Sequence, residues 1–171
     1  YVRQYIEWQD RGQGTGAPVN IYPASSDILS KTTRDEFRKD RLPNGNYIED
    51  TANHFVLFEN NQGIWEQALI AMKSTQRKKS KRWNSLMLGL KIKGSKGLIT
   101  PPSYSHIYTM KSMVEQNDLG TWFGWDISRD GPVKDQDIYQ QAKAFSASVA
   151  AGDVKVKHED ESSEGAEEAP Y

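Results

Sequence analysis

The 48 residues between Glu66 and Glu115 contain no aspartate or glutamate, although 26% of the chain is charged. Ten basic residues lie in this acid-free interval: Lys73, Arg77, Lys78, Lys79, Lys81, Arg82, Lys91, Lys93, Lys96 and Lys111. Because basic side chains are rarely buried without a partner, the interval must fold so that most of them stay at the surface. A solvated helix face usually mixes both signs of charge, so this pattern favours a polyanionic partner.

Charge of the opposite sign gathers at the other end of the sequence. Residues 158–171 hold six acidic residues and no Lys or Arg, whereas the first 157 residues carry a net charge of +5. The acidic segment is also rich in Ser, Gly and Ala, a composition typical of disorder. We therefore predict a nucleic-acid-binding body over residues 1–152 and a disordered acidic tail over residues 153–171.

Two helices are predicted from hydrophobic spacing. Over residues 74–90 an apolar stripe recurs at i, i+3, i+4 and i+7, formed by Trp83, Leu86, Met87 and Leu90. A second helix is expected near the C-terminal end of the body, with Asp135 as its N-cap and Gly152 as its stop.

Alternating β-prone runs predict five strands, near residues 19–22, 54–59, 64–72, 104–114 and 121–128. A turn over Asn60–Gly63 joins the second strand to the third, and residues 94–97 read as a flexible basic loop. In the last strand, Phe123, Trp125 and Ile127 share one face and are expected in the core. The overall class is α+β and β-rich.

Aromatic residues near the basic interval add a second signal. A base stacked on an aromatic ring contributes about 1–3 kcal/mol with little sequence preference. The candidate rings are Tyr104, Tyr108, Trp65 and Trp122. Trp122 is the best placed, because its neighbours on the same strand face, Gly124 and Asp126, are not core-like. Each ring could instead fill the core. The predicted nucleic-acid site is the ten basic residues with Tyr104, Tyr108 and Trp122.

The sequence ends Glu167-Glu168-Ala169-Pro170-Tyr171. This resembles the C-terminal tip of bacterial and phage single-stranded DNA-binding proteins, with Tyr in place of their Phe and Glu in place of the more usual Asp. The resemblance implies an OB-like five-stranded barrel with one helix between strands 3 and 4. It also implies that Glu167, Glu168, Pro170 and Tyr171 recruit replication or recombination proteins.

Several classes of chemistry lack support in the sequence. There is no cysteine, which excludes disulfides and thiolate zinc sites. His54, His106 and His158 lie far apart in the sequence, and no nucleotide-binding or nucleophile-elbow motif occurs. No apolar run reaches the length of a membrane span. We expect no enzymatic activity, no cofactor, no metal and no membrane contact, and a cytoplasmic location, in the host cytoplasm if the gene is phage-encoded.

These observations predict a single-stranded DNA-binding protein of replication or recombination with low sequence specificity. One alternative is a phage structural or assembly protein that contacts DNA or an acidic partner. Another is a nuclease or nucleotide-processing enzyme, whose metal-binding carboxylates would have to lie outside the acid-free interval. The preference for DNA over RNA, and whether the chain forms a homodimer, are left open by the sequence.

Overall fold

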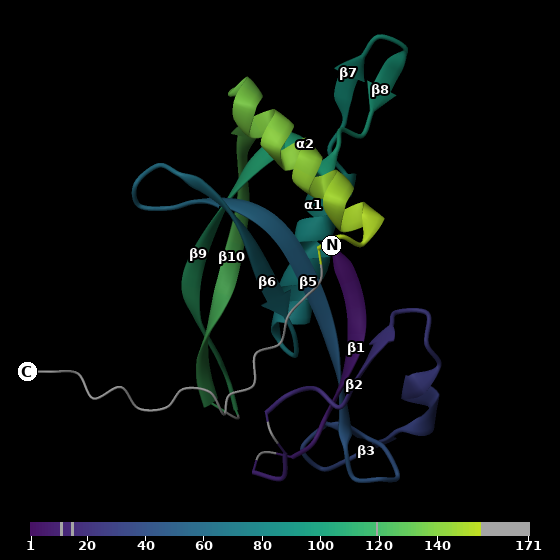
Figure 1. Cartoon of the computed structure of the whole chain (residues 1–171). Coiled ribbons are helices and arrows are strands. Elements are labelled where there is room, and N and C mark those ends of the chain that lie inside the picture. The colour runs from purple at the N-terminus through teal and green to yellow at the C-terminus, as the bar shows by residue number, and fades with distance from the viewer. Residues whose placement is uncertain (11, 15, 119, 155–171) are drawn as a thin grey trace, which may run out of the picture. The chain divides into compact units, whose positions relative to one another are not determined.

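The structure is a computed structural model that describes residues 1–10, 12–14, 16–118 and 120–154 (Figure 1). These residues form two compact units, Tyr1–Asn53 and the described residues from His54 on, and each is treated by itself. Between them, the described residues contain two α-helices and three antiparallel sheets, so the β-rich α+β class is confirmed. Neither helix is long and apolar enough to cross a membrane.

The first unit is built on one antiparallel sheet with the strand order β2-β1-β5-β4-β3. Its elements are β1 (Val2–Trp8), β2 (Asn20–Pro23), the 3-10 helix η1 (Ile28–Lys31), β3 (Thr33–Arg34), β4 (Asp40–Arg41) and the first half of β5 (Tyr47–Glu59). A small core of Tyr5, Ile28 and Ile48 packs against Tyr22, Leu29 and Leu42.

The carboxylate of Glu7 is buried in this first unit and holds its connections together. It accepts hydrogen bonds from Asn20, Tyr22, Asn44 and Asn46 at 2.7 to 3.2 Å, so both oxygens have two donors. Burial alone would raise the pKa of Glu7, but the four hydrogen bonds outweigh it and lower the pKa to about 2. The carboxylate therefore acts as a charged link between β1, β2 and the turn before β5.

The second unit contains both α-helices and the longest hairpin. Its elements are the rest of β5, β6 (Trp65–Met72), α1 (Gln76–Leu88), β7 (Ile92–Gly94), β8 (Gly97–Ile99), the 3-10 helix η2 (Ser103–Ser105), β9 (His106–Asn117), β10 (Gly120–Pro132) and α2 (Gln136–Ala151). β6 pairs with β5, β7 with β8, and β9 with β10.

Both helices and the turn after β5 form where the sequence predicts them. Asn60 accepts hydrogen bonds from the backbone N–H groups of Gln62 and Ile64, which fixes the predicted turn. Asp135 caps α2 by accepting from two backbone N–H groups, and Gly152 ends it with a left-handed φ of 81°.

Other expectations are not met. The five-stranded OB barrel is not confirmed, because the described strands fall into three sheets and β9 and β10 pair only with each other. Strand β1 was not predicted, since consecutive residues Tyr5, Ile6 and Glu7 are all buried and no alternation of period two is present. The predicted loop over residues 94–97 is the turn of the hairpin formed by β7 and β8, where Gly97 has a φ of 120°.

Candidate nucleic-acid interface

Helix α1 separates its cations by face. Lys78, Lys81 and Arg82 are exposed, at the i, i+3, i+4 spacing that gathers side chains on one side of a helix. Ser80 and Trp83 are buried on the opposite side. The apolar stripe at Trp83 therefore orients the helix, and the exposed cations follow from it. We call Lys78, Lys81 and Arg82 the cationic face of α1.

The buried side of α1 packs on an aromatic cluster. The Trp83 ring stacks on His54 with centroids 4.6 Å apart and meets the Tyr108 ring edge-on at 5.9 Å. The His54 Nε2 and Ser80 Oγ atoms lie 2.8 Å apart. Burial, with the nearby Arg77 charge, lowers the pKa of His54 to about 4. His54 is therefore neutral at pH 7, and its contacts indicate a structural role.

The first half of α1 is tied to the hairpin formed by β9 and β10. The Lys79 Nζ atom lies 2.5 Å from a carboxylate oxygen of Glu115, and the Trp122 Nε1 group donates to the other oxygen at 3.0 Å. The Lys79 hydrogen bond lowers the pKa of Glu115. Of the predicted cations, Lys79 is thus engaged in an ion pair, and Trp122 is held beside it.

The register of the hairpin assigns its side chains to two faces. Trp122 pairs with Glu115, Gly124 with Met113, and Asp126 with Lys111, so these six residues share the face that contacts α1. Trp122 is half-buried there, and Lys111 is exposed. The structure thus places two predicted site residues on the same face of the hairpin.

The opposite face of the hairpin corrects the sequence analysis. Phe123 and Trp125 were expected in the core, but their exposed fractions are 75% and 37%, whereas Ile127 is buried at 5%. Phe123 pairs with Val114, which is 61% exposed. The alternation itself was right, but the covering layer reaches only Ile127. We call Val114, Phe123 and Trp125 the apolar strip.

The two predicted tyrosines are half-buried. The Tyr104 ring, on η2, packs edge-on against Tyr139 of α2 with centroids 5.5 Å apart. Tyr108 packs on Trp83, and burial raises the pKa of its phenol. These contacts show that both rings help to position the helices.

The remaining predicted cations are spread over the second unit. Arg77 is half-buried on α1, and Lys73 is exposed before it. Lys91, Lys93 and Lys96 are exposed on or beside the β7–β8 hairpin. The predicted tail residues Glu167, Glu168, Pro170 and Tyr171 lie outside the described residues.

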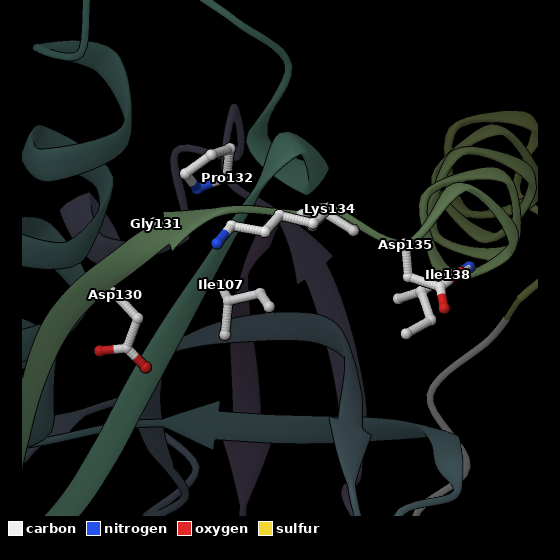
Figure 2. Close-up of a pocket in the computed structure, with 8 residues that line it drawn as sticks. Ile107, Asp130, Gly131, Pro132, Lys134, Asp135 and Ile138 are labelled. Atoms are coloured by element: carbon white, nitrogen blue, oxygen red, sulfur yellow. Dashed lines mark hydrogen bonds between the residues drawn. The ribbon is translucent and has the colours of Figure 1, made fainter.

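A hollow of about 480 Å³ lies where β10 leads into α2 (Figure 2). Its wall is largely apolar, with Ile107, Pro132 and Ile138, and Lys134 extends across it. Of its two carboxylates, Asp130 accepts a hydrogen bond from Thr109 and Asp135 caps α2. The described residues include no group of three or more His, Cys, Asp or Glu side chains that could hold a metal ion. The hollow therefore offers no evident catalytic constellation.

Comparison with known proteins places this β-rich α+β chain in a phage protein family. Residues 1–155 match the family model described as Pam3 phage gp34-like protein, so the chain belongs to that family. No curated protein and no solved structure matches the chain.

Proposed function

We propose that this phage protein binds single-stranded DNA through the cationic face of α1 and the adjoining face of the β9–β10 hairpin. The observation that carries the proposal is the Lys79–Glu115–Trp122 contact, which holds an indole ring beside a helix with three exposed cations. The proposal needs only this helix and hairpin, and does not depend on a closed OB barrel.

The chemistry of these residues suits a flexible polyanion. Exposed Lys and Arg side chains neutralise phosphates and release counterions, a term that is independent of sequence. A half-exposed indole supplies a flat surface on which any base can stack. The expected activity is therefore coating of single-stranded DNA with low sequence preference, as replication and recombination require.

Neighbouring residues on opposite faces of the hairpin provide the test. Binding of labelled oligo-dT is measured by fluorescence anisotropy at low salt. Trp122→Ala is expected to weaken binding about tenfold through the lost stacking surface, whereas Phe123→Ala is the matched control and leaves binding unchanged. Trp122→Phe, which retains a ring but loses the hydrogen bond to Glu115, restores most of the affinity.

Three results would count against the proposal. The first is the absence of oligo-dT binding by the unaltered chain. The second is unchanged affinity in Trp122→Ala, which removes this ring from the interface. The third is equal weakening by Trp122→Phe and Trp122→Ala, which assigns the effect to the Glu115 contact. Repeating the titration with oligo-U tells DNA preference from RNA preference.

The acidic segment is proposed to recruit replication or recombination proteins, following the resemblance of its last five residues to the tip of single-stranded DNA-binding proteins. Six carboxylates and a terminal aromatic residue suit a basic, apolar pocket on a partner. Removing residues 157–171 is expected to abolish capture of such partners while leaving oligo-dT binding intact or stronger. Weaker oligo-dT binding would contradict this division of labour.

A role as a phage structural or assembly protein is the second candidate, and the apolar strip favours it. Val114, Phe123 and Trp125 are exposed together, and exposed apolar patches commonly mark protein contacts. This candidate predicts stoichiometric incorporation into purified particles, measured by mass spectrometry, and its loss in Phe123→Ser. Particles without the protein would argue against it.

A further inference from the structure

The β7–β8 hairpin exposes aliphatic side chains that folding does not explain. Leu98 is 74% exposed, Ile99 47% and Ile92 37%. Each strand has three residues, and in the described part of the chain β7 and β8 pair only with each other. A two-stranded ribbon this short is marginally stable by itself in water. Figure 1 shows it as a separate projection.

The charge on this hairpin indicates the class of its partner. Lys91, Lys93 and Lys96 are exposed on it, and the acid-free interval leaves no acidic residue within it. Lys91 donates a hydrogen bond to Thr100, which closes the base of the ribbon. Three cations without a local counter-charge suit a polyanion.

The register places one aliphatic side chain beside a cation. Lys93 pairs with Leu98, so both extend from one face, while Ile92 and Ile99 pair on the other. A cation beside an apolar wedge is the combination that architectural proteins use to grip a phosphate and unstack a base step. A two-stranded ribbon is also narrow enough to enter the major groove of a duplex.

The type of apolar side chain distinguishes a duplex from a single strand. Splayed bases bind aromatic rings, and this hairpin has none. Aliphatic side chains instead insert between stacked pairs or cover the last pair of a duplex. A membrane surface fits less well, because interfacial binding normally uses a long amphipathic helix with a large apolar face.

We propose that the β7–β8 hairpin binds base-paired DNA, with Leu98 covering or unstacking the terminal pair where a duplex meets a single strand. This inference rests on the proposed function, because that function supplies the single strand next to the duplex. The substrate class of the protein is then a junction between single- and double-stranded DNA.

The experiment compares three labelled DNAs with the full chain: oligo-dT, a blunt duplex, and a duplex carrying an oligo-dT arm of the same length. The armed duplex is expected to bind about tenfold more tightly than oligo-dT, the effect of burying one leucine. Leu98→Ser removes this preference and leaves oligo-dT binding unchanged. Val114→Ser is the matched control, a similarly exposed aliphatic residue on a different hairpin, and it retains the preference.

A second readout reports on the wedge itself. With 2-aminopurine in the terminal pair of the armed duplex, binding of the unaltered chain and of Val114→Ser is expected to raise its fluorescence. Leu98→Ser, added at saturating concentration, gives no rise. A rise that persists in Leu98→Ser would overturn the assignment of the wedge.

The outcomes separate this inference from the proposed function. Equal affinity for oligo-dT and the armed duplex overturns the junction while single-strand binding stands. Loss of preference in both serine variants also overturns it, since the effect would not belong to this hairpin. Absence of binding to every DNA overturns both proposals. Leu98-dependent binding to vesicles rich in phosphatidylserine, without a junction preference, replaces DNA with a membrane as the partner.

Discussion

The two units of the chain use charge for different purposes. Residues 1–53 hold seven basic and eight acidic residues, whereas residues 54–157 hold 15 basic and nine acidic residues. In the first unit, Arg41 bridges Asp10 and Asp35 at 2.8 and 2.7 Å, and Arg3 pairs with Asp50 at 2.8 Å. In the second unit, the cationic face of α1 is turned to solvent. The comparison indicates that charge holds the first unit together and is available to a partner in the second.

The largest expected effect comes from reversing the cationic face. Lys78, Lys81 and Arg82 changed together to Glu should weaken oligo-dT binding about a thousandfold at low salt, because attraction to phosphate becomes repulsion. The matched control changes Arg34 and Arg38, exposed cations of the first unit, and is expected to alter binding by less than about threefold. Equal losses from both variants would erase the distinction between the units.

The Glu7 carboxylate tests the structural use of charge in the first unit. Glu7→Gln should lower the free energy of unfolding by about 3 kcal/mol, because the new amide group turns a donor toward donors that the carboxylate accepted. Urea denaturation measures the loss. Glu36→Gln, at an exposed position of the same unit, should change stability by less than about 0.5 kcal/mol. A neutral result for Glu7→Gln would show that the charge is dispensable.

His54 sharpens the comparison because the second unit buries a group that must stay neutral. Its pKa of about 4 lies below the ordinary value of 6.5, so the unfolded chain binds the proton first as the pH falls. The free energy of unfolding should therefore drop by about 2 kcal/mol between about pH 7 and about pH 5 through this residue.

The measurement for His54 is the pH dependence of urea unfolding. The slope between those pH values should be much flatter in His54→Gln, whatever the absolute stability of the variant. His106→Gln is the control; burial also lowers the pKa of His106, but that residue is less buried, so a smaller part of the slope should disappear. An unchanged slope in His54→Gln contradicts a buried neutral imidazole.

The smallest expected effect concerns the cap of α2, which is local. Asp135→Ala removes a side chain that accepts from the backbone of Asp137 and Ile138. It should cost about 1 kcal/mol of unfolding free energy and leave oligo-dT binding unchanged. Asp153→Ala, beyond the helix end, is the matched control. A loss of binding in Asp135→Ala would extend the interface to α2.

The sequence predicted features whose cause is local. The stripe through Trp83 oriented α1, and Asp135 and Gly152 marked α2, because periodicity and capping act within a few residues. It could not predict β1, since Glu7 is buried by donors up to 39 residues away. Phe123 and Trp125 were misplaced for a similar reason, because alternation assigns faces but does not show which face is covered.

The candidate site was predicted in part. The cations of α1 were found by the missing acids, which is a property of the sequence alone. The engagement of Lys79 with Glu115, and the packing of Tyr104 and Tyr108 on other rings, depend on contacts between distant elements. The exposure of Leu98 gave no sequence signal, because a leucine in a short strand predicts burial.

The salt dependence of oligo-dT affinity tests the central claim most directly. If the cationic face of α1 contacts phosphates, the logarithm of the binding constant should fall linearly with the logarithm of salt concentration, with a slope of about −0.7 per contact. Changing Lys78, Lys81 and Arg82 together to Ala should make that slope shallower by about 2. A slope unchanged by this variant, or no binding at about 50 mM salt, would contradict the claim that these cations bind nucleic acid.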